Sequence, residues 1–288
     1  MTPAVERAPT PARSLEATPR LAAVPAAPVP PAAPAAPLVL VVGSGKGGVG
    51  KSVVTILLGA IAAQAGRRVL LCDADYNLAN LHVLLGVRPA THMDELLQGT
   101  VQPAELLRPL RERLWLLPGA SGGDPLQALE PLDRARLHQR LTSAFSGFDV
   151  VVVDAGAGVD GVLRATTIGA GRLILVTSPE PAALTDAYAV MKLVHLRAAT
   201  VPLDVLVNQC RDGEDGRIAF DKLAIAAERF LRRGIRYLGA IVDDSTIRAA
   251  VREPANCLAI LEASDTMRRL TPCLLDRLNL AGPVRSVE

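Results

Sequence analysis

The chain has 288 residues, of which 50% are hydrophobic, and its 31 basic and 29 acidic residues leave a formal net charge of +2. This balance gives no strong electrostatic case for binding to nucleic acid or to an anionic membrane. The 4 cysteines are scattered and contain no C-x-x-C pair, which disfavours a zinc site, an iron–sulfur site and the role of an iron–sulfur cluster carrier. Scattered thiols favour a reducing compartment, so we expect the protein in the cytoplasm.

The first 37 residues are rich in alanine and proline, with few charges and no periodic apolar face. Such a stretch buries too little surface to offset its ordering entropy, so we expect a disordered or polyproline-like tail over residues 1–37. Its prolines are incompatible with the apolar region of a signal peptide. We expect one α/β domain with a buried parallel sheet over residues 38–265, and a C-terminal helix or tail over 266–288.

A glycine-rich stretch lies between an apolar run at 38–42 and an apolar-periodic segment at 52–65. Gly45 to Ser52 fits G-x-x-x-x-G-K-[ST], which predicts a phosphate-binding loop between a strand and a helix. Lys51 is expected to reach the β- and γ-phosphates, and the Ser52 hydroxyl to bind Mg²⁺. The residues whose backbone is expected to surround the phosphates are Gly45, Gly47, Gly48, Val49 and Gly50.

Further elements follow in chain order. Periodicity and turn residues predict helices at 91–99 and 131–145, and helical segments within 181–192, 213–233 and 243–252. Apolar runs predict strands at 68–72, 114–117, 148–154, 172–177, 203–209 and 237–241.

Two of these strands end in carboxylates. Asp73 and Asp75 follow the strand at 68–72, and Asp154 ends the strand at 148–154. Ligands gather beyond the carboxyl ends of parallel strands, so we expect these side chains to face the phosphates. Carboxylates there suit Mg²⁺ and the attacking water of phosphoryl transfer, and Asp154 is expected to hold Mg²⁺ through water.

Lys46 places a second lysine early in the loop. With it, the string Lys-Gly-Gly-Val-Gly-Lys-Ser resembles the deviant Walker-A ATPases, the family of MinD and ParA. The resemblance runs from about residue 38 to 253. It implies a doubly wound, mostly parallel P-loop NTPase fold of the SIMIBI type and slow hydrolysis of ATP. It also implies an ATP-dependent homodimer in which Lys46 contacts the partner's nucleotide.

The same resemblance assigns roles in the two switch segments. Asp73-Ala74-Asp75 and Asn80 are similar to switch I, D-x-D-x-G-x-x-N, which implies that Asp73 supports Mg²⁺, Asp75 orients the lytic water and Asn80 helps to hold the water or the γ-phosphate. Residues 155–158 resemble switch II, with Gly158 approaching the γ-phosphate. Two departures, Asn77 for glycine and Ala155 for threonine, are expected to slow turnover.

Recognition of the base is expected from Asn208, at the end of the strand over 203–209. A carboxamide offers a donor and an acceptor that match adenine, and family members use an asparagine here. No N-K-x-D guanine motif is present in the sequence, so ATP is expected rather than GTP.

Residues 78–86 and 179–189 resemble the flagellar-number branch of this family, known as FlhG or FleN, as does the stretch 243–252, which edges the nucleotide pocket in that branch. The resemblance implies control of flagellum number and placement. It implies partners such as an FlhF-like GTPase, a flagellar switch-complex protein or a flagellar transcription regulator. The branch's D-Q-A-x-x-L-R activator stretch is absent from residues 1–37, so the sequence gives no support for activation of the GTPase.

Three questions stay open. Residues 267–278 carry leucines and arginines, as do the membrane-binding helices of MinD-like relatives, but we expect Pro272 to interrupt them. They either associate reversibly with an anionic membrane or pack on the domain.

A ParA-like DNA-partitioning ATPase is the second alternative. It would need a basic surface, for which residues 232–236 are the candidate, although DNA is not the expected partner. The third alternative is an ATP-sensing module that is nearly silent in hydrolysis.

Overall fold

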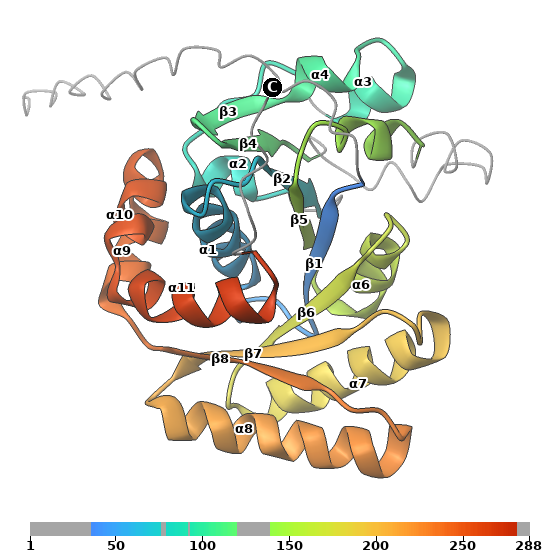
Figure 1. Cartoon of the computed structure of the whole chain (residues 1–288), viewed down its shortest axis with the longest axis vertical. Coiled ribbons are helices and arrows are strands. Elements are labelled where there is room, and N and C mark those ends of the chain that lie inside the picture. The colour runs from blue at the N-terminus through green and yellow to red at the C-terminus, as the bar shows by residue number, and fades with distance from the viewer. Residues whose placement is uncertain (1–35, 76–78, 92, 120–138, 281–288) are drawn as a thin grey trace, which may run out of the picture.

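The fold is built on an eight-stranded sheet with the strand order β3-β4-β2-β5-β1-β6-β7-β8 (Figure 1). The computed structural model describes residues 36–75, 79–91, 93–119 and 139–280. Among the described strands only β3 pairs antiparallel, with β4, and the expected doubly wound α/β fold is confirmed. The strands are β1 (Leu38–Ser44), β2 (Val69–Ala74), β3 (Arg108–Arg111), β4 (Leu114–Leu117), β5 (Val150–Ala155), β6 (Arg172–Thr177), β7 (Leu203–Cys210) and β8 (Arg236–Val242).

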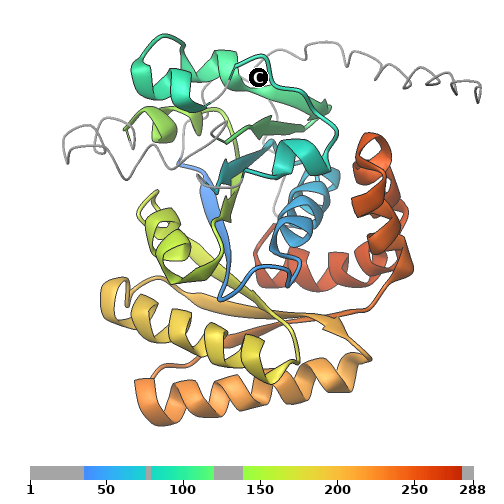
Figure 2. The same ribbon diagram turned by 180° about the vertical axis from the view of Figure 1, so that it is seen from behind.

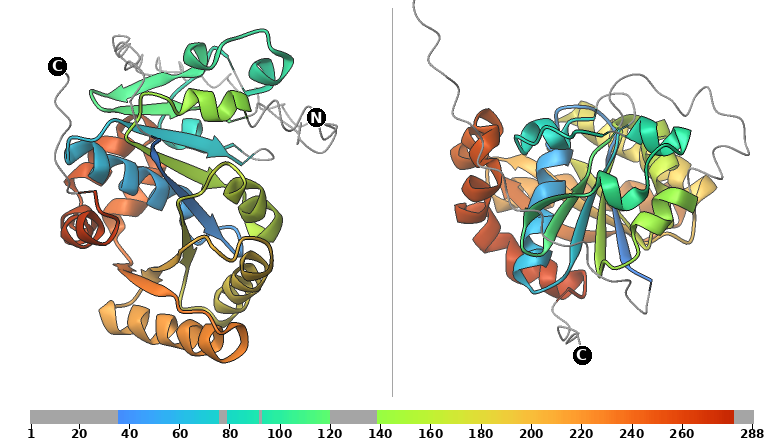
Figure 3. Two further views of the ribbon diagram at one scale, coloured as in Figure 1. Left: turned by 45° about the vertical axis from the view of Figure 1, so that its right-hand side comes forward. Right: turned by 90° about the horizontal axis from the view of Figure 1, so that it is seen from above.

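Helices cover both faces of this sheet (Figures 2 and 3). One face carries α1 (Lys51–Gln64), α9 (Ser245–Arg252), α10 (Cys257–Ala263) and α11 (Asp265–Arg277). The other carries α6 (Gly158–Thr166), α7 (Pro181–Arg197), α8 (Gly213–Ala226) and the π-helix η1 (Ala227–Leu231). The short elements are α2 (Leu81–Leu84), α3 (Met93–Gln98), α4 (Pro103–Leu106) and the 3₁₀-helix η2 (Pro254–Asn256).

The continuous apolar runs of the sequence are explained by this sandwich. In β1, Val39 and Val41 belong to the core on the α6–α7 side, whereas Leu40 and Val42 belong to the core on the α1 side. Because side chains alternate along a strand and both faces are covered, every position needs an apolar residue. The strand at 148–154 was expected for this reason and forms as β5.

Some expected elements differ from those observed. The strand β3 was not expected, because four residues containing Pro109 give little signal. Of the helix expected at 131–145, only residues 139–145 lie within the described residues, and 139–144 are helical. The helix expected at 91–99 forms as α3 and is followed by Gly99 at φ 75°.

The helix α11 runs through Pro272, so the expected interruption is wrong. Met267 and Leu270 before the proline, and Leu274 after it, are buried against the domain, and this packing holds the helix together on both sides of the missing N–H. The apolar residues that the sequence offers to a membrane are therefore part of the core. No helix among the described residues is long and apolar enough to cross a bilayer.

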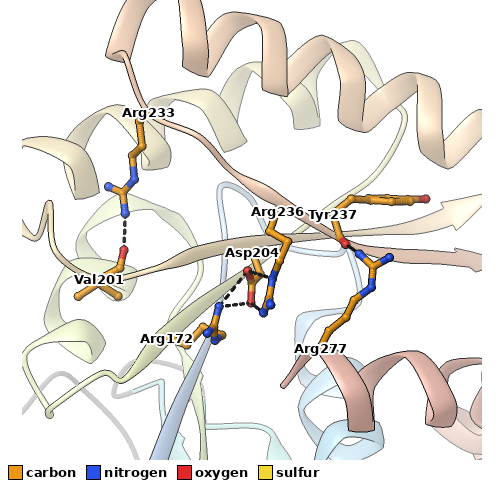
Figure 4. A network of polar contacts seen from close by, with 7 residues as sticks. All are labelled: Arg172, Val201, Asp204, Arg233, Arg236, Tyr237 and Arg277. Atoms are coloured by element: carbon orange, nitrogen blue, oxygen red, sulfur yellow. Dashed lines mark hydrogen bonds and ion pairs between the residues drawn. The ribbon is translucent and has the colours of Figure 1, made fainter. Parts of the chain in front are cut away.

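Both edges of the sheet are protected from further pairing. At the β8 edge, Arg277 of α11 donates a hydrogen bond to the carbonyl of Tyr237 (Figure 4). The Cys273 thiol donates to the carbonyl of Leu238 at 3.2 Å. At the other edge β3 is short and its register with β4 is irregular. These features are those by which proteins avoid edge-to-edge association.

A buried carboxylate ties together the amino ends of β6, β7 and β8 (Figure 4). Asp204, which is 1% exposed, accepts hydrogen bonds from Nε and Nη2 of Arg236 at 2.9 Å and from Nη1 of Arg172 at 3.1 and 3.2 Å. Arg233 lies nearby and donates to the carbonyl of Val201. The network lies at the amino ends of the strands, whereas the phosphate-binding sequence follows the carboxyl end of β1.

Candidate nucleotide-binding site

The glycine-rich stretch forms the loop between β1 and α1, as its sequence predicts. Gly48 and Gly50 have φ angles of 83° and 89°, which glycine adopts without strain. A Cβ on Gly50 would also lie 2.2 Å from Nδ2 of Asn208, so glycine is required there on steric grounds as well. The helix α1 begins at Lys51, and its amino end supplies the partial positive charge that favours an anion.

A cavity of about 560 Å³ opens beside this loop, at the carboxyl ends of the strands. The predicted site residues that line it come from the loop, from switch I and from β7: Gly47, Gly48, Gly50, Lys51, Ser52, Asp75, Asn80 and Asn208. The predicted residues that do not line it are Gly45, Lys46, Val49, Asp73, Asp154 and Gly158. Its opposite wall comes from residues 242–252, the stretch expected to edge the pocket.

Beneath the cavity Lys51 forms a buried ion pair with Asp154. Nζ lies 2.7 Å from Oδ1, and the two side chains are 8% and 1% exposed. Burial raises the pKa of Asp154, and the charge of Lys51 opposes that rise. Thr55 donates a hydrogen bond to the same oxygen at 3.1 Å. Sequence reasoning missed Thr55, although its spacing of four residues from Lys51 places both on one face of α1.

Asp73 and Asp154 are neighbours across β2 and β5. Asp73 is fully buried and accepts hydrogen bonds from the backbone N–H groups of Asp75 at 3.1 Å and Leu81 at 3.0 Å. Burial, and then the charge of Asp154, raise the pKa of Asp73 to about 7. Two buried carboxylates side by side repel each other, so this is a place where a cation would be stabilised.

The oxygens of Asp73, Asp154 and Ser52 fit Mg²⁺ in their chemistry. Mg²⁺ prefers oxygen ligands, and in nucleotide sites it takes one or two carboxylates and completes its shell with phosphate oxygens and water. Within the described residues no group of three or more His, Cys, Asp or Glu side chains could hold a metal alone, which this mode of binding does not require.

The two switch segments meet at Asp75 and Gly156. A Cβ on Gly156 would lie 3.4 Å from Oδ1 of Asp75, so switch II packs against the proposed water-positioning residue. Gly158 has a φ of 83° and lies outside the cavity, with its Cβ position 3.9 Å from the carbonyl of Gly45. Asn80 is exposed and precedes α2. Asn77 lies outside the described residues.

Lys46 points away from the cavity of its own chain. Its Nζ lies 2.6 Å from Oε2 of Glu180, at the start of α7, and the two side chains are 32% and 64% exposed. An ion pair this exposed is worth at most about 1 kcal/mol. Lys46 is therefore held weakly and remains available for another contact.

Asn208 lines the cavity, but its amide nitrogen is already engaged. Nδ2 donates to the carbonyl of Val49 at 2.8 Å, and the next residue, Gln209, donates through Nε2 to the carbonyl of Gly48 at 3.0 Å. The oxygen of Asn208 is the atom that would face an exocyclic amine. Gln209 was not predicted as a site residue.

Comparison with known proteins agrees with this geometry. A model of the CobQ/CobB/MinD/ParA nucleotide-binding domain matches residues 40–255. The chain belongs to the MinD/ParA family. It is thus an ATPase domain of that family, as the deviant Walker-A sequence predicted.

Among relatives in the MinD/ParA family, the antiactivator FleN of Pseudomonas aeruginosa is 35% identical over 215 residues, which cover 75% of this chain and 77% of that protein. The flagellum site-determining protein YlxH of Helicobacter pylori is 32% identical over 211 residues, 73% of this chain and 71% of that protein. The cell division ATPase MinD of Pyrococcus furiosus has the same fold, with a TM-score of 0.69 at 24% identity over 84% of this chain and 99% of that one. MinD of Pyrococcus horikoshii, solved with Mg-ADP, superposes equally well, with a TM-score of 0.69 at 24% identity over 86% of this chain and 99% of that one.

Proposed function

We propose that this chain is an ATP-dependent switch that binds Mg-ATP in the cavity beside the loop, dimerises, hydrolyses ATP slowly to ADP and phosphate, and so regulates flagellum number and placement. The observation that carries the proposal is the division of the two lysines. Lys51 lines the cavity of its own chain, whereas Lys46 does not line it and pairs with Glu180 instead. ATP would then shift the chain between two assembly states.

Each predicted residue has a task in this proposal. The loop amides and Lys51 bind the phosphates, Asp75 orients the attacking water, and Asn80 and Gly158 approach the γ-phosphate. Asn208 faces the adenine. Ser52, Asp73 and Asp154 would hold Mg²⁺, which when bound neutralises charge on the phosphates. In this structure Lys51 donates to Asp154, and a bound phosphate would be a further acceptor for its ammonium group, which has three N–H donors.

The test of the switch is the mass of the chain in solution. We would measure light scattering after size exclusion with ADP, with ATP, and with ATP on a Lys46→Ala variant. Lys222→Ala, which removes an exposed lysine on α8, is the matched control. We expect a dimer with ATP in the wild type and in Lys222→Ala, and a monomer in Lys46→Ala. A monomer of the wild-type chain in ATP would rule out the trans-acting lysine.

The flagellar output rests on similarity to the FleN and YlxH proteins. We infer partners of three kinds: an FlhF-like GTPase, a flagellar switch-complex protein and a flagellar transcription regulator. The third kind is consistent with the name of the relative FleN, which is called an antiactivator. Counting flagella in cells that carry Lys46→Ala or Lys51→Ala in place of the wild type tests this output. Unchanged number and position in both would contradict it.

A ParA-like role on DNA has less support. In the basic run 232–236, Arg236 is paired with the buried Asp204 and Arg233 is bonded to a backbone carbonyl (Figure 4). Fewer arginines are then free for phosphate contacts than the sequence alone indicates. Strong, salt-sensitive retention of nonspecific DNA in ATP would favour the partitioning role over the flagellar one.

We place the chain in the cytoplasm, and reversible association with an anionic membrane stays a proposal that would need α11 to leave the core. Sedimentation with vesicles of anionic lipid, with and without ATP, tests it.

The alternative of an ATP-sensing module that is nearly silent in hydrolysis is tested by the rate of ATP turnover. It is favoured if ATP drives dimerisation while phosphate release is undetectable over hours.

A further inference from the structure

The carboxyl end of β7 contains a β-bulge at the nucleotide site. Val207 pairs with Ala240 and Cys210 with Val242, so Asn208 and Gln209 together stand opposite the single residue Ile241 of β8. Gln209 has a φ of 59°, the left-handed region that non-glycine residues rarely adopt. Bulges of this kind re-aim side chains next to active sites.

The bulge changes which side chains share a face. Side chains at successive positions of a regular strand point to opposite faces of the sheet. Val207 and Cys210 nevertheless lie in the same core cluster, although three positions separate them. The extra residue thus allows Asn208 and Gln209 to point to the same side, and both carboxamides reach the phosphate-binding loop.

Their targets are consecutive carbonyls of that loop. Nδ2 of Asn208 donates to Val49 at 2.8 Å, and Nε2 of Gln209 donates to Gly48 at 3.0 Å. A loop that turns its N–H groups inward to an anion turns its carbonyls outward, where they need donors. The two carboxamides supply those donors from a strand that the loop does not belong to.

We infer that Gln209 is a positioning residue for ATP. With Asn208 it forms a carboxamide clamp that fixes the peptide groups Gly48–Val49 and Val49–Gly50, so that the N–H groups of Val49 and Gly50 face the phosphates. The clamp rests on the proposed nucleotide site and adds to it a residue that no motif marks. An exposed hydrogen bond adds little to the stability of the fold, and a glutamine in the left-handed region lowers that stability. This arrangement therefore does not serve the stability of the fold. Strain kept beside a binding loop is expected where it serves the ligand.

The clamp is tested with Gln209→Met, which keeps the length of the side chain and removes the donor, and with Gln209→Gly, which also relaxes the backbone. Gln139→Met, at an exposed helical glutamine far along the chain, is the matched control. We would measure the Kd for Mg-ADP, kcat and KM for ATP, and the Tm without nucleotide.

In both Gln209 variants we expect the Kd and the KM to rise about tenfold while kcat changes less than about twofold, because the loop holds ground state and transition state alike. The Tm without nucleotide stays unchanged in Gln209→Met and is unchanged or higher in Gln209→Gly. Wild-type affinity in Gln209→Met would overturn the clamp, as would a loss of affinity that follows a loss of Tm. A wild-type chain that does not bind Mg-ADP would overturn the site and the clamp together.

Discussion

At the scale of single residues, the pairing of the buried Asp204 with two arginines is an ion-pair contact whose removal should lower stability measurably. Asp204→Ala leaves Arg172 and Arg236 without their shared carboxylate. Breaking a fully buried pair costs roughly 3–5 kcal/mol, but these arginines are 25% and 40% exposed and regain water, so we expect about 2 kcal/mol in urea denaturation. Asp221→Ala, which breaks the exposed pair with Arg217, is the control and should cost under about 0.5 kcal/mol.

Asp73 gives the site a pH dependence that metal should abolish. Its pKa is raised from 3.8 to about 7, so the folded chain holds this proton more tightly than the unfolded chain does. The contribution of Asp73 to stability is therefore full below its unfolded pKa of 3.8 and is lost as the pH rises to about 7, by on the order of 4 kcal/mol. We expect the free energy of unfolding of the wild type to fall relative to that of Asp73→Asn between pH 4 and 7. Parallel curves for the two proteins without Mg²⁺ would contradict the assignment.

At the scale of elements, α11 is predicted to be a structural helix. Leu274→Ala deletes a side chain that is 1% exposed, which costs roughly 2–5 kcal/mol in a packed core. Leu196→Ala on α7, where the leucine is 64% exposed, is the control and should change stability little. Equal effects of the two variants on the midpoint of urea denaturation would mean that α11 leaves the domain in solution.

The elements also show what sequence could and could not predict. The loop and the acidic ends of β2 and β5 were predictable, because a glycine spacing and an apolar run ending in aspartate are local patterns with one physical meaning. The continuation of α11 through Pro272 depends on side chains packed against it, and the bulge at Gln209 depends on the register of β8. In both cases the residues that decide the structure are distant in the sequence. The role of Thr55 was hidden for the same reason, since its partner Asp154 lies on another strand.

At the scale of the whole molecule, the two ends of the sheet have separate tasks. The carboxyl ends of the strands gather the loop, the switch carboxylates and the clamp, whereas the amino ends carry the network around Asp204. Variants at one end should therefore leave the other unaffected. Asp204→Ala is expected to lower Tm without changing the KM for ATP of the protein that stays folded.

The cover of the β8 edge has a consequence for how the chain is made. The helix that closes this edge, α11, is the last helix among the described residues, so a chain still on the ribosome has completed the described sheet before residues 265–277 can cover it. During that interval β8 offers free backbone groups to neighbouring nascent chains. A chain that stops after residue 264 would make the interval permanent, and we expect it to be recovered from cells in aggregates while the 288-residue chain is recovered in solution. Equal recovery of both in the supernatant would show that the edge is harmless when open.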